Sequence, residues 1–197
     1  LLSNNDSDER VRIMHVIASL REKALPIIIS RIEQEAPWFY LRNLAYLLGQ
    51  IGQEDTARFL APLLEHGNDK VRQEALKSLY KIGGKHRGSI LLAALRGADE
   101  DFKVNIVDVL GQSKSIEAVP VLIDLLKNRP LIASTARTAL EEKICIALGA
   151  IGSADATGPL SEIASAKSFL NLRSYPDKVK AAAASSLRAL KKKIAQS

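Results

Sequence analysis

The side chains that could carry chemistry in this 197-residue chain are few and scattered. His15, His66 and His86 are the only histidines, and none has a second histidine at helical spacing with which to share a metal ion. Cys145 is the single cysteine, so an internal disulfide and a cysteine zinc cluster are both excluded. It stands beside Ile144 in a core-facing pattern and is expected to be a buried apolar side chain rather than a nucleophile.

The acidic residues and glycines add no catalytic motif. Asp99, Glu100 and Asp101, like Glu141 and Glu142, stand at expected helix starts, where the helix dipole favours negative charge. The sequence contains no glycine-rich phosphate loop, nucleophile elbow or kinase signature. Because catalysis needs titratable groups gathered in one cleft, the sequence predicts that the chain is not an enzyme, with no catalytic residue, metal or cofactor.

The elements that position these residues repeat along the chain. Five segments align without gaps, and their starts lie 31, 31, 38 and 39 residues apart. Apolar residues recur within each segment at helical spacing, which predicts an amphipathic helix. The segments are residues 40–52, 71–83, 102–114, 140–152 and 179–191, with Leu48, Leu79, Leu110, Leu148 and Leu187 in the ninth position. A degenerate copy at residues 11–20 begins the series.

A second apolar segment of similar length follows each of these helices. Pro26, Pro120 and Pro159 fall in the first turn of such segments, where the missing N–H costs nothing. Short helices arranged in pairs must stack on their neighbours to bury their apolar faces. The sequence therefore predicts an all-α fold, an α-α superhelix of about 5.5 helix pairs and 11 helices. One domain is expected over residues 1–197, with a flexible segment at 1–10, an inserted loop at 167–176 and a basic cap helix at 177–197.

Three phrases carry a family resemblance: LLGQIGQEDTARFLAPLL, SIEAVPVLIDLLKN and ALGAIGSADATGPLSEI. They resemble the short bacterial HEAT repeat of the phycobilisome-lyase type, an armadillo-like superhelix, over roughly residues 11–191. The resemblance implies the HEAT-like solenoid fold, and it implies bilin lyase activity as one alternative function. Another HEAT-like enzyme, deoxyhypusine hydroxylase, builds a di-iron site from repeated His-Glu pairs. The sequence has no His-Glu dipeptide, so that activity is not expected.

The net charge of +6 is concentrated at the end of the chain. Residues 1–166 carry 20 Lys and Arg against 21 Asp and Glu, a net charge of −1, whereas residues 167–197 carry eight basic residues against one acidic residue, a net charge of +7. This basic end is consistent with a polar cap that keeps the solenoid soluble, or with a docking patch for an acidic partner, RNA or DNA.

Positions along the second helices test whether nucleic acid could lie in the groove of the solenoid. One row reads Glu65, Arg96, Lys127 and Ser165, and its neighbour reads Pro62, Ala93, Asp124 and Glu162. A phosphate backbone prefers an unbroken basic stripe, so these mixed charges disfavour duplex binding along the groove. Arg96 and Lys127 are candidate contacts for a protein partner.

Two further regions are candidate partner-binding sites. Trp38, Tyr40, Arg42 and Asn43 open a repeat, and they form either an aromatic lid over the first helix pair or a surface anchor of the type common in interface hot spots. The two long repeat spacings insert loops on one edge, and these loops carry Arg129 in one case and Arg173 and Tyr175 in the other. Their apolar residues are equally suited to fold back over the core.

These observations predict a non-catalytic scaffold or adaptor that binds a protein partner along its concave face or on the edge with the two insertions. Nucleic-acid binding through the basic tail and bilin lyase activity are the alternatives. The longest uncharged apolar stretch is too short to span a bilayer, and no secretory signal is present, so a cytoplasmic protein without a membrane partner is expected. Because the chain begins with Leu, we expect it to be a portion of a larger protein.

Overall fold

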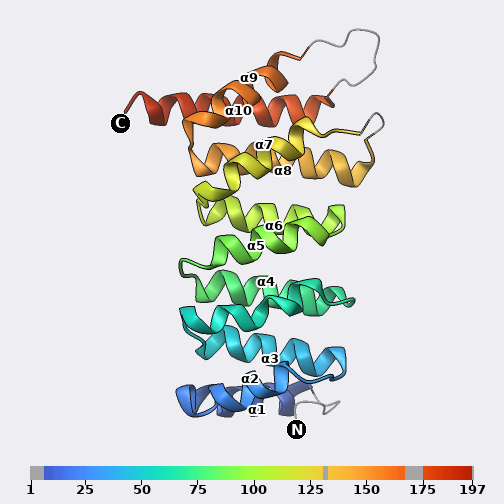
Figure 1. Ribbon diagram of the computed structural model, residues 1–197, viewed down its shortest axis with the longest axis vertical. Coiled ribbons are helices and arrows are strands. Elements are labelled where there is room, and N and C mark those ends of the chain that lie inside the picture. The colour runs from blue at the N-terminus through green and yellow to red at the C-terminus, as the bar shows by residue number, and fades with distance from the viewer. Residues whose placement is uncertain (1–6, 131–132, 167–174, 197) are drawn as a thin grey trace. The chain divides into compact units, whose positions relative to one another are not determined.

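The structure is a computed structural model, and it describes residues 7–130, 133–166 and 175–196 (Figure 1). These residues form α-helices and 3₁₀-helices, with no strand among them. Contacts between Cα atoms divide the chain into two compact units, Leu1–Ala94 and Leu95–Ser197.

Unit 1 stacks short helices in pairs. α3 packs on α4 and also contacts α1 and α2, whereas the 3₁₀-helices η2 and η3 pack on α4. The elements are α1 (Ser7–Ser19), η1 (Arg21–Lys23), α2 (Leu25–Ile32), α3 (Trp38–Ile51), η2 (Glu54–Leu60), η3 (Pro62–Glu65), α4 (Asp69–Ile82) and α5 (Arg87–Gly97), the last of which continues past the unit boundary.

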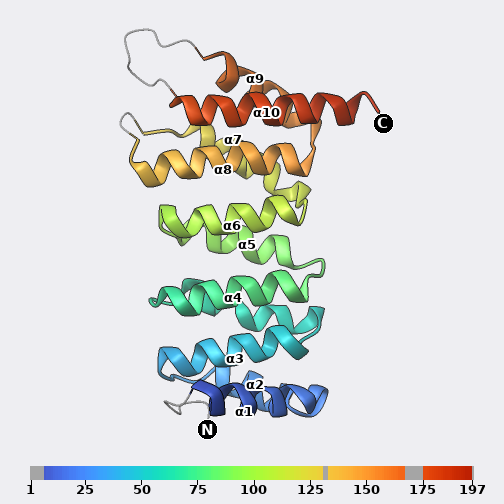
Figure 2. The same ribbon diagram turned by 180° about the vertical axis from the view of Figure 1, so that it is seen from behind.

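Unit 2 repeats this arrangement, and its helices α8 and α10, with 17 and 18 residues, are longer than α3 and α4 of unit 1, with 14 each. α8 packs against α6 on one side and α10 on the other, and α9 packs on α10 (Figure 2). The elements are α6 (Glu100–Gln112), η4 (Ile116–Ala118), α7 (Val119–Lys127), α8 (Thr135–Ile151), η5 (Ala154–Ala156), α9 (Thr157–Ser165) and α10 (Asp177–Ile194).

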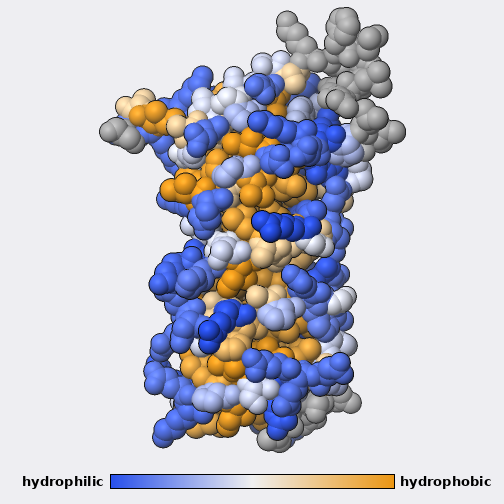
Figure 3. All heavy atoms as spheres, in the orientation of Figure 1, coloured by the Kyte–Doolittle hydropathy of each residue, from blue (hydrophilic) through white to orange (hydrophobic). Residues whose placement is uncertain are grey.

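The repeated leucines form the core of both units, as the alignment predicts. Leu48, Leu79, Leu110 and Leu148 are fully buried. The fifth copy differs, because Leu187 is only partly buried and Leu190, one turn later in α10, is fully buried instead. On the face drawn in Figure 3, hydrophobic side chains are exposed along the middle of each unit, with hydrophilic side chains on either side.

Close approach between successive first helices depends on glycine. A Cβ added to Gly149 of α8 would lie 2.6 Å from Cβ of Ser186 on α10, a separation too short for two carbon atoms. The same holds in α3 and α4, where a Cβ on Gly49 would lie 2.6 Å from Cβ of Ser78. In α6 and α8, a Cβ on Gly111 would lie 2.9 Å from that of Ala147. Glycine facing a small residue therefore lets these backbones pack closely.

Two local predictions need correction, and a third lies mostly outside the described residues. Residues 7–10 are helical rather than flexible, with Asp8 and Glu9 in the first turn of α1, where the helix dipole favours their charge. The segment after Thr56 forms η2 and η3 instead of an α-helix, because Pro62 lacks the N–H that an α-helix would use at that point. Of the inserted loop predicted at 167–176, residues 167–174 lie outside the described part of the chain, and Tyr175 and Pro176 immediately precede α10.

Candidate functional site

The structure brings together residues from both long connections around one buried carboxylate. Glu141 of α8 is fully buried, and its Oε1 accepts hydrogen bonds from Nε of Arg129 at 2.9 Å and from Nε of Arg137 at 3.1 Å. The guanidinium of Arg129 stacks on the ring of Tyr175, 4.4 Å from its centroid. We call Arg129, Arg137, Glu141 and Tyr175 the Glu141 cluster.

The Glu141 cluster also satisfies the exposed carbonyls at the end of α7. Nη2 of Arg137 donates to the carbonyl oxygens of Leu125 and Asn128, and the Tyr175 hydroxyl donates to that of Leu126 at 3.2 Å. The last carbonyls of a helix lack partners within the helix and carry partial negative charge, so a guanidinium is well suited to this position. The cluster therefore joins the end of α7, the start of α10 and the interior of α8.

Tyr175 of this cluster and Cys145, which lies one turn after Glu141 on α8, are both poorly suited to act as nucleophiles at neutral pH. Burial, followed by the charges of Glu141 and Glu142, raises the pKa of the Cys145 thiol to about 12. Burial and the charge of Glu141 also raise the pKa of the Tyr175 phenol above its usual value. Both groups are protonated at neutral pH, so Cys145 is a buried apolar residue, as the sequence predicts.

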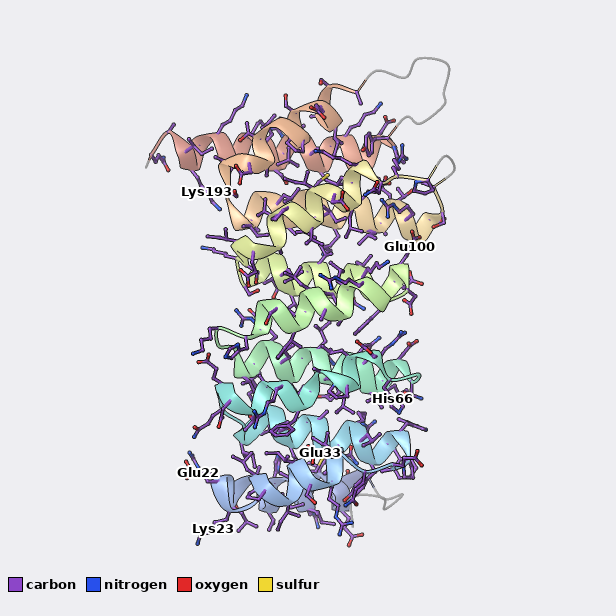
Figure 4. All side chains as sticks on the ribbon, viewed as in Figure 1. Glu22, Lys23, Glu33, His66, Glu100 and Lys193 are labelled. Atoms are coloured by element: carbon purple, nitrogen blue, oxygen red, sulfur yellow. The ribbon has the colours of Figure 1, made fainter. Side chains whose placement is uncertain are left out.

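Sequence reasoning missed Glu141 and Arg137 as members of a site. Glu141 was expected at a helix start, but α8 begins at Thr135, so Glu141 lies in the second turn on the buried face. Ser134 caps this helix by accepting from the backbone N–H of Arg137 at 2.9 Å, and it donates to Glu100 of α6 at 2.8 Å (Figure 4). The spacing of Arg137 and Glu141, four residues apart, was the available indication of an ion pair.

The predicted residues around Trp38 also lie together, at the start of α3. The ring of Trp38 contacts Phe39 edge-on, and the cations of Arg42 and Lys70 lie 5.8 and 5.2 Å from its centroid. Nη2 of Arg42 donates to the buried Asn43 at 2.8 Å. Trp38 and Tyr40 are each partly buried. Both earlier interpretations, lid and anchor, are compatible with this arrangement.

The other predicted contacts are dispersed. Arg96 borders a groove of about 460 Å³ in unit 2 whose lining also includes Lys103, Pro120 and Asp124. Lys127 is the last residue of α7 and is exposed. Arg173 lies outside the described residues. Arg96 and Lys127 belong to unit 2, whereas Trp38 belongs to unit 1.

A groove runs between α8 and α10, and we call it the α8–α10 groove. It has a volume of about 580 Å³. Ile146 of α8, 44% exposed, lies on its floor beside alanine residues of both helices. At one end Lys178 pairs with Glu142 at 3.5 Å. At the other end the ammonium of Lys193 reaches the carbonyl oxygens of Gly149 and Ala150 at 3.5 and 3.3 Å, and Figure 4 shows this side chain directed from α10 towards α8.

Within residues 7–130, 133–166 and 175–196, no group of three or more His, Cys, Asp or Glu side chains could hold a metal ion. The helices described there include none that is long and apolar enough to cross a membrane.

Comparisons with known proteins support the fold. No family model matches the sequence, and no curated protein matches it. Among solved structures, human deoxyhypusine hydroxylase in complex with glycerol is similar, with a TM-score of 0.50 and 14% sequence identity over 97% of this chain and 82% of the hydroxylase chain. The chain therefore has the helical, HEAT-like solenoid fold that the sequence predicts.

This similarity also corrects the functional prediction. The sequence predicted a non-catalytic scaffold without enzyme activity, because it contains no catalytic motif and its repeats serve packing. A solenoid similar over nearly the whole chain belongs to an enzyme, so this prediction is wrong. Neither alternative, nucleic-acid binding through the basic tail or bilin lyase activity, fits this finding. At 14% identity the similarity establishes the fold, and it does not assign the hydroxylase reaction to this chain.

Proposed function

We propose that the chain acts within an enzyme as the part that binds a polypeptide substrate, and that the α8–α10 groove is the binding surface. The observation that carries the proposal is a long apolar floor between two lysines on a fold that an enzyme also uses. The proposal assigns substrate binding, and not the chemical step, to these residues.

The shape of the groove suits a helix. Its floor consists mainly of small residues, because Gly149 and Ser186 bring the backbones of α8 and α10 close together. Lys178 and Lys193 are 15 residues apart on α10, which corresponds to about 22 Å at 1.5 Å per residue. A helix of about four turns would span this length with its apolar face on the floor, a common mode of peptide recognition.

The charge of the groove favours an acidic substrate. α10 has one acidic residue, Asp177, and its basic residues are Lys178, Lys180, Arg188, Lys191, Lys192 and Lys193. The side chain of Lys178 is 47% exposed although it pairs with Glu142. Carboxylates at both ends of a bound helix would meet lysines, which steers association and fixes orientation. We therefore expect an amphipathic helix with a small apolar face and acidic ends.

Fluorescence anisotropy tests this proposal. The probe is a fluorescein-labelled 18-residue peptide with alanine and leucine on one face and glutamate in its first and last turns. We expect saturable binding that weakens as salt is added. Ile146→Glu should weaken binding at least tenfold, or about 1.4 kcal/mol, because it places a carboxylate on the apolar floor.

Ile90→Glu is the matched control, because Ile90 lines a different groove, of about 530 Å³, in unit 1. Equal binding by a peptide with lysine in place of glutamate, or an equal loss with both variants, would contradict the proposal. The link to an enzyme is tested by mass spectrometry of the peptide after incubation in an extract of the source organism. A covalent change should depend on the added chain and be lost with Ile146→Glu.

Other features of the sequence stay proposals. The repeat phrases favour the short bacterial HEAT repeat of the lyase type, and a cytoplasmic location stays a proposal. The predicted partner contacts, from Trp38 to Tyr175, also stay predictions, and alanine scanning with the same peptide would test them.

A further inference from the structure

Glu141 is the one buried acidic side chain among the described residues, and it is fully buried. Both arginines of the Glu141 cluster donate to the same oxygen, Oε1, and Oε2 finds no hydrogen-bond partner among the described residues. A buried polar group without a partner is costly, and a partly satisfied network is less stable than a complete one. The cluster is therefore poorly suited to a purely stabilising role in the core.

The two arginines are held in different ways. Arg137 belongs to α8 itself, and its guanidinium also donates to carbonyl oxygens at the end of α7. Arg129 lies in the connection between α7 and α8, and its guanidinium bridges Glu141 to the ring of Tyr175. Loss of Arg137 would remove the hydrogen bonds to the end of α7, whereas loss of Arg129 would remove the bridge between Glu141 and Tyr175.

We infer that Arg129, Glu141 and Tyr175 form a latch that holds the start of α10 against the end of α7, with Arg137 as its fixed anchor. Release of Arg129 uncouples the Tyr175 ring from Glu141 and leaves the hydrogen bond from the Tyr175 hydroxyl to Leu126 as the remaining contact of Tyr175 with the end of α7. Both segments then loosen, while the cores of α8 and α10 stay packed through their buried leucines. Lys178 follows Tyr175 by three residues, so the latch also fixes the position of Lys178 at one end of the α8–α10 groove. Only this last consequence rests on the proposed function.

Hydrogen exchange on the whole chain tests the latch. Three backbone amides report on the segments concerned: Asn128 donates to Asp124 at the end of α7, and Val179 and Lys180 donate to Pro176 at the start of α10. The amide of Gly152, which donates to Leu148 at the far end of α8, is the internal reference. We expect Arg129→Ala to speed exchange at the three reporter amides at least tenfold and to leave the Gly152 amide unchanged.

Two further variants separate a latch from general destabilisation. Glu141→Gln should speed exchange at the same amides, and the double variant with Arg129→Ala should add nothing, because both changes break one bridge. Arg137→Ala should lower the melting temperature and speed exchange at Gly152 as well. Faster exchange at Asn128 alone, or equally faster exchange at Gly152 in Arg129→Ala, would overturn the latch. A changed peptide affinity is not required, so this test is independent of the proposed groove.

Discussion

At the scale of single residues, the sequence predicted the burial of Cys145 but not the role of Glu141 in a buried ion pair. A small apolar side chain in a core column stays buried in almost any helical packing, so burial of Cys145 follows from periodicity alone. The role of Glu141 depends on where α8 begins and on a tyrosine 34 residues away in sequence. The spacing of residues near Glu141 indicates neither fact. Glu141 and Glu142 were therefore predicted to lie at the start of a helix.

The raised pKa of Cys145 predicts a dependence of stability on alkaline pH. The folded thiol has a pKa of about 12, whereas an unfolded chain has the ordinary value, near 9. Between these values the folded state binds more protons than the unfolded state, so the free energy of unfolding falls as pH rises. We expect a loss of about 1 kcal/mol per pH unit just above pH 9.

Urea unfolding from pH 8 to pH 10 measures this slope, and Cys145→Ala should remove most of it. Other groups titrate in this range in both proteins, so the difference between the two slopes isolates the effect of the Cys145 thiol. An identical slope in both proteins would show that the thiol does not titrate differently on folding.

At the scale of elements, the repeat pattern predicted most helices, and local chemistry decided the exceptions. Gly83 and Gly152 end α4 and α8 with positive φ, as expected for glycine after a helix. Asn68 and Asp99 cap α4 and α6 through their side chains. The 3₁₀-helices η2 and η3 could not be predicted from periodicity, because their apolar spacing resembles that of the α-helical repeats.

Packing of α8 on α10 predicts different effects for two glycines. Gly149→Ala should destabilise unit 2 by about 1–3 kcal/mol, because its new methyl group would collide with Ser186. Gly158→Ala in α9 is the control without such a collision, because only its chain neighbours and the backbone of its own helix lie within 4 Å of its added Cβ. Pro159 follows it and offsets the gain in helix propensity, so this variant should change stability by less than about 1 kcal/mol.

Thermal and urea unfolding of both variants measure these changes. Ser186→Gly should restore part of the loss in Gly149→Ala, because it removes the colliding atoms. An unchanged free energy of unfolding in Gly149→Ala would mean that α8 and α10 can move apart at little cost.

At the scale of the whole molecule, contacts between Cα atoms divide the chain into two compact units. The single HEAT-repeat domain expected over residues 1–197 stays a prediction. Repeat proteins gain stability from contacts between neighbouring elements, and these contacts are not apparent in an alignment of the repeats. Unit 2 has its own core of fully buried leucines and isoleucines on α6, α7, α8, α9 and α10: Ile106, Leu110, Leu122, Leu140, Ile144, Leu148, Leu160 and Leu190.

This core predicts that residues 99–197 fold alone. The fragment begins at Asp99, which caps α6 by accepting from the backbone N–H of Phe102 at 2.8 Å. We expect a helical circular dichroism spectrum and a cooperative thermal transition. A fragment of residues 106–197, which lacks the cap and the first turns of α6, should melt at a lower temperature. A non-cooperative transition for residues 99–197 would mean that unit 2 depends on the rest of the chain.

The glycine contacts between first helices have a consequence for how such a chain can lengthen. Each contact is divided between two repeats, because the glycine belongs to one repeat and the serine or alanine that faces it belongs to the next. Both halves are supplied in the correct order by a copy of the repeat that carries Ala147 and Gly149, or of the two-repeat block that begins with Ser78 and ends with Gly111. Insertion of an unrelated helix pair supplies neither half. An array of this kind is therefore expected to grow by copying its own blocks, and each junction would preserve the matching halves.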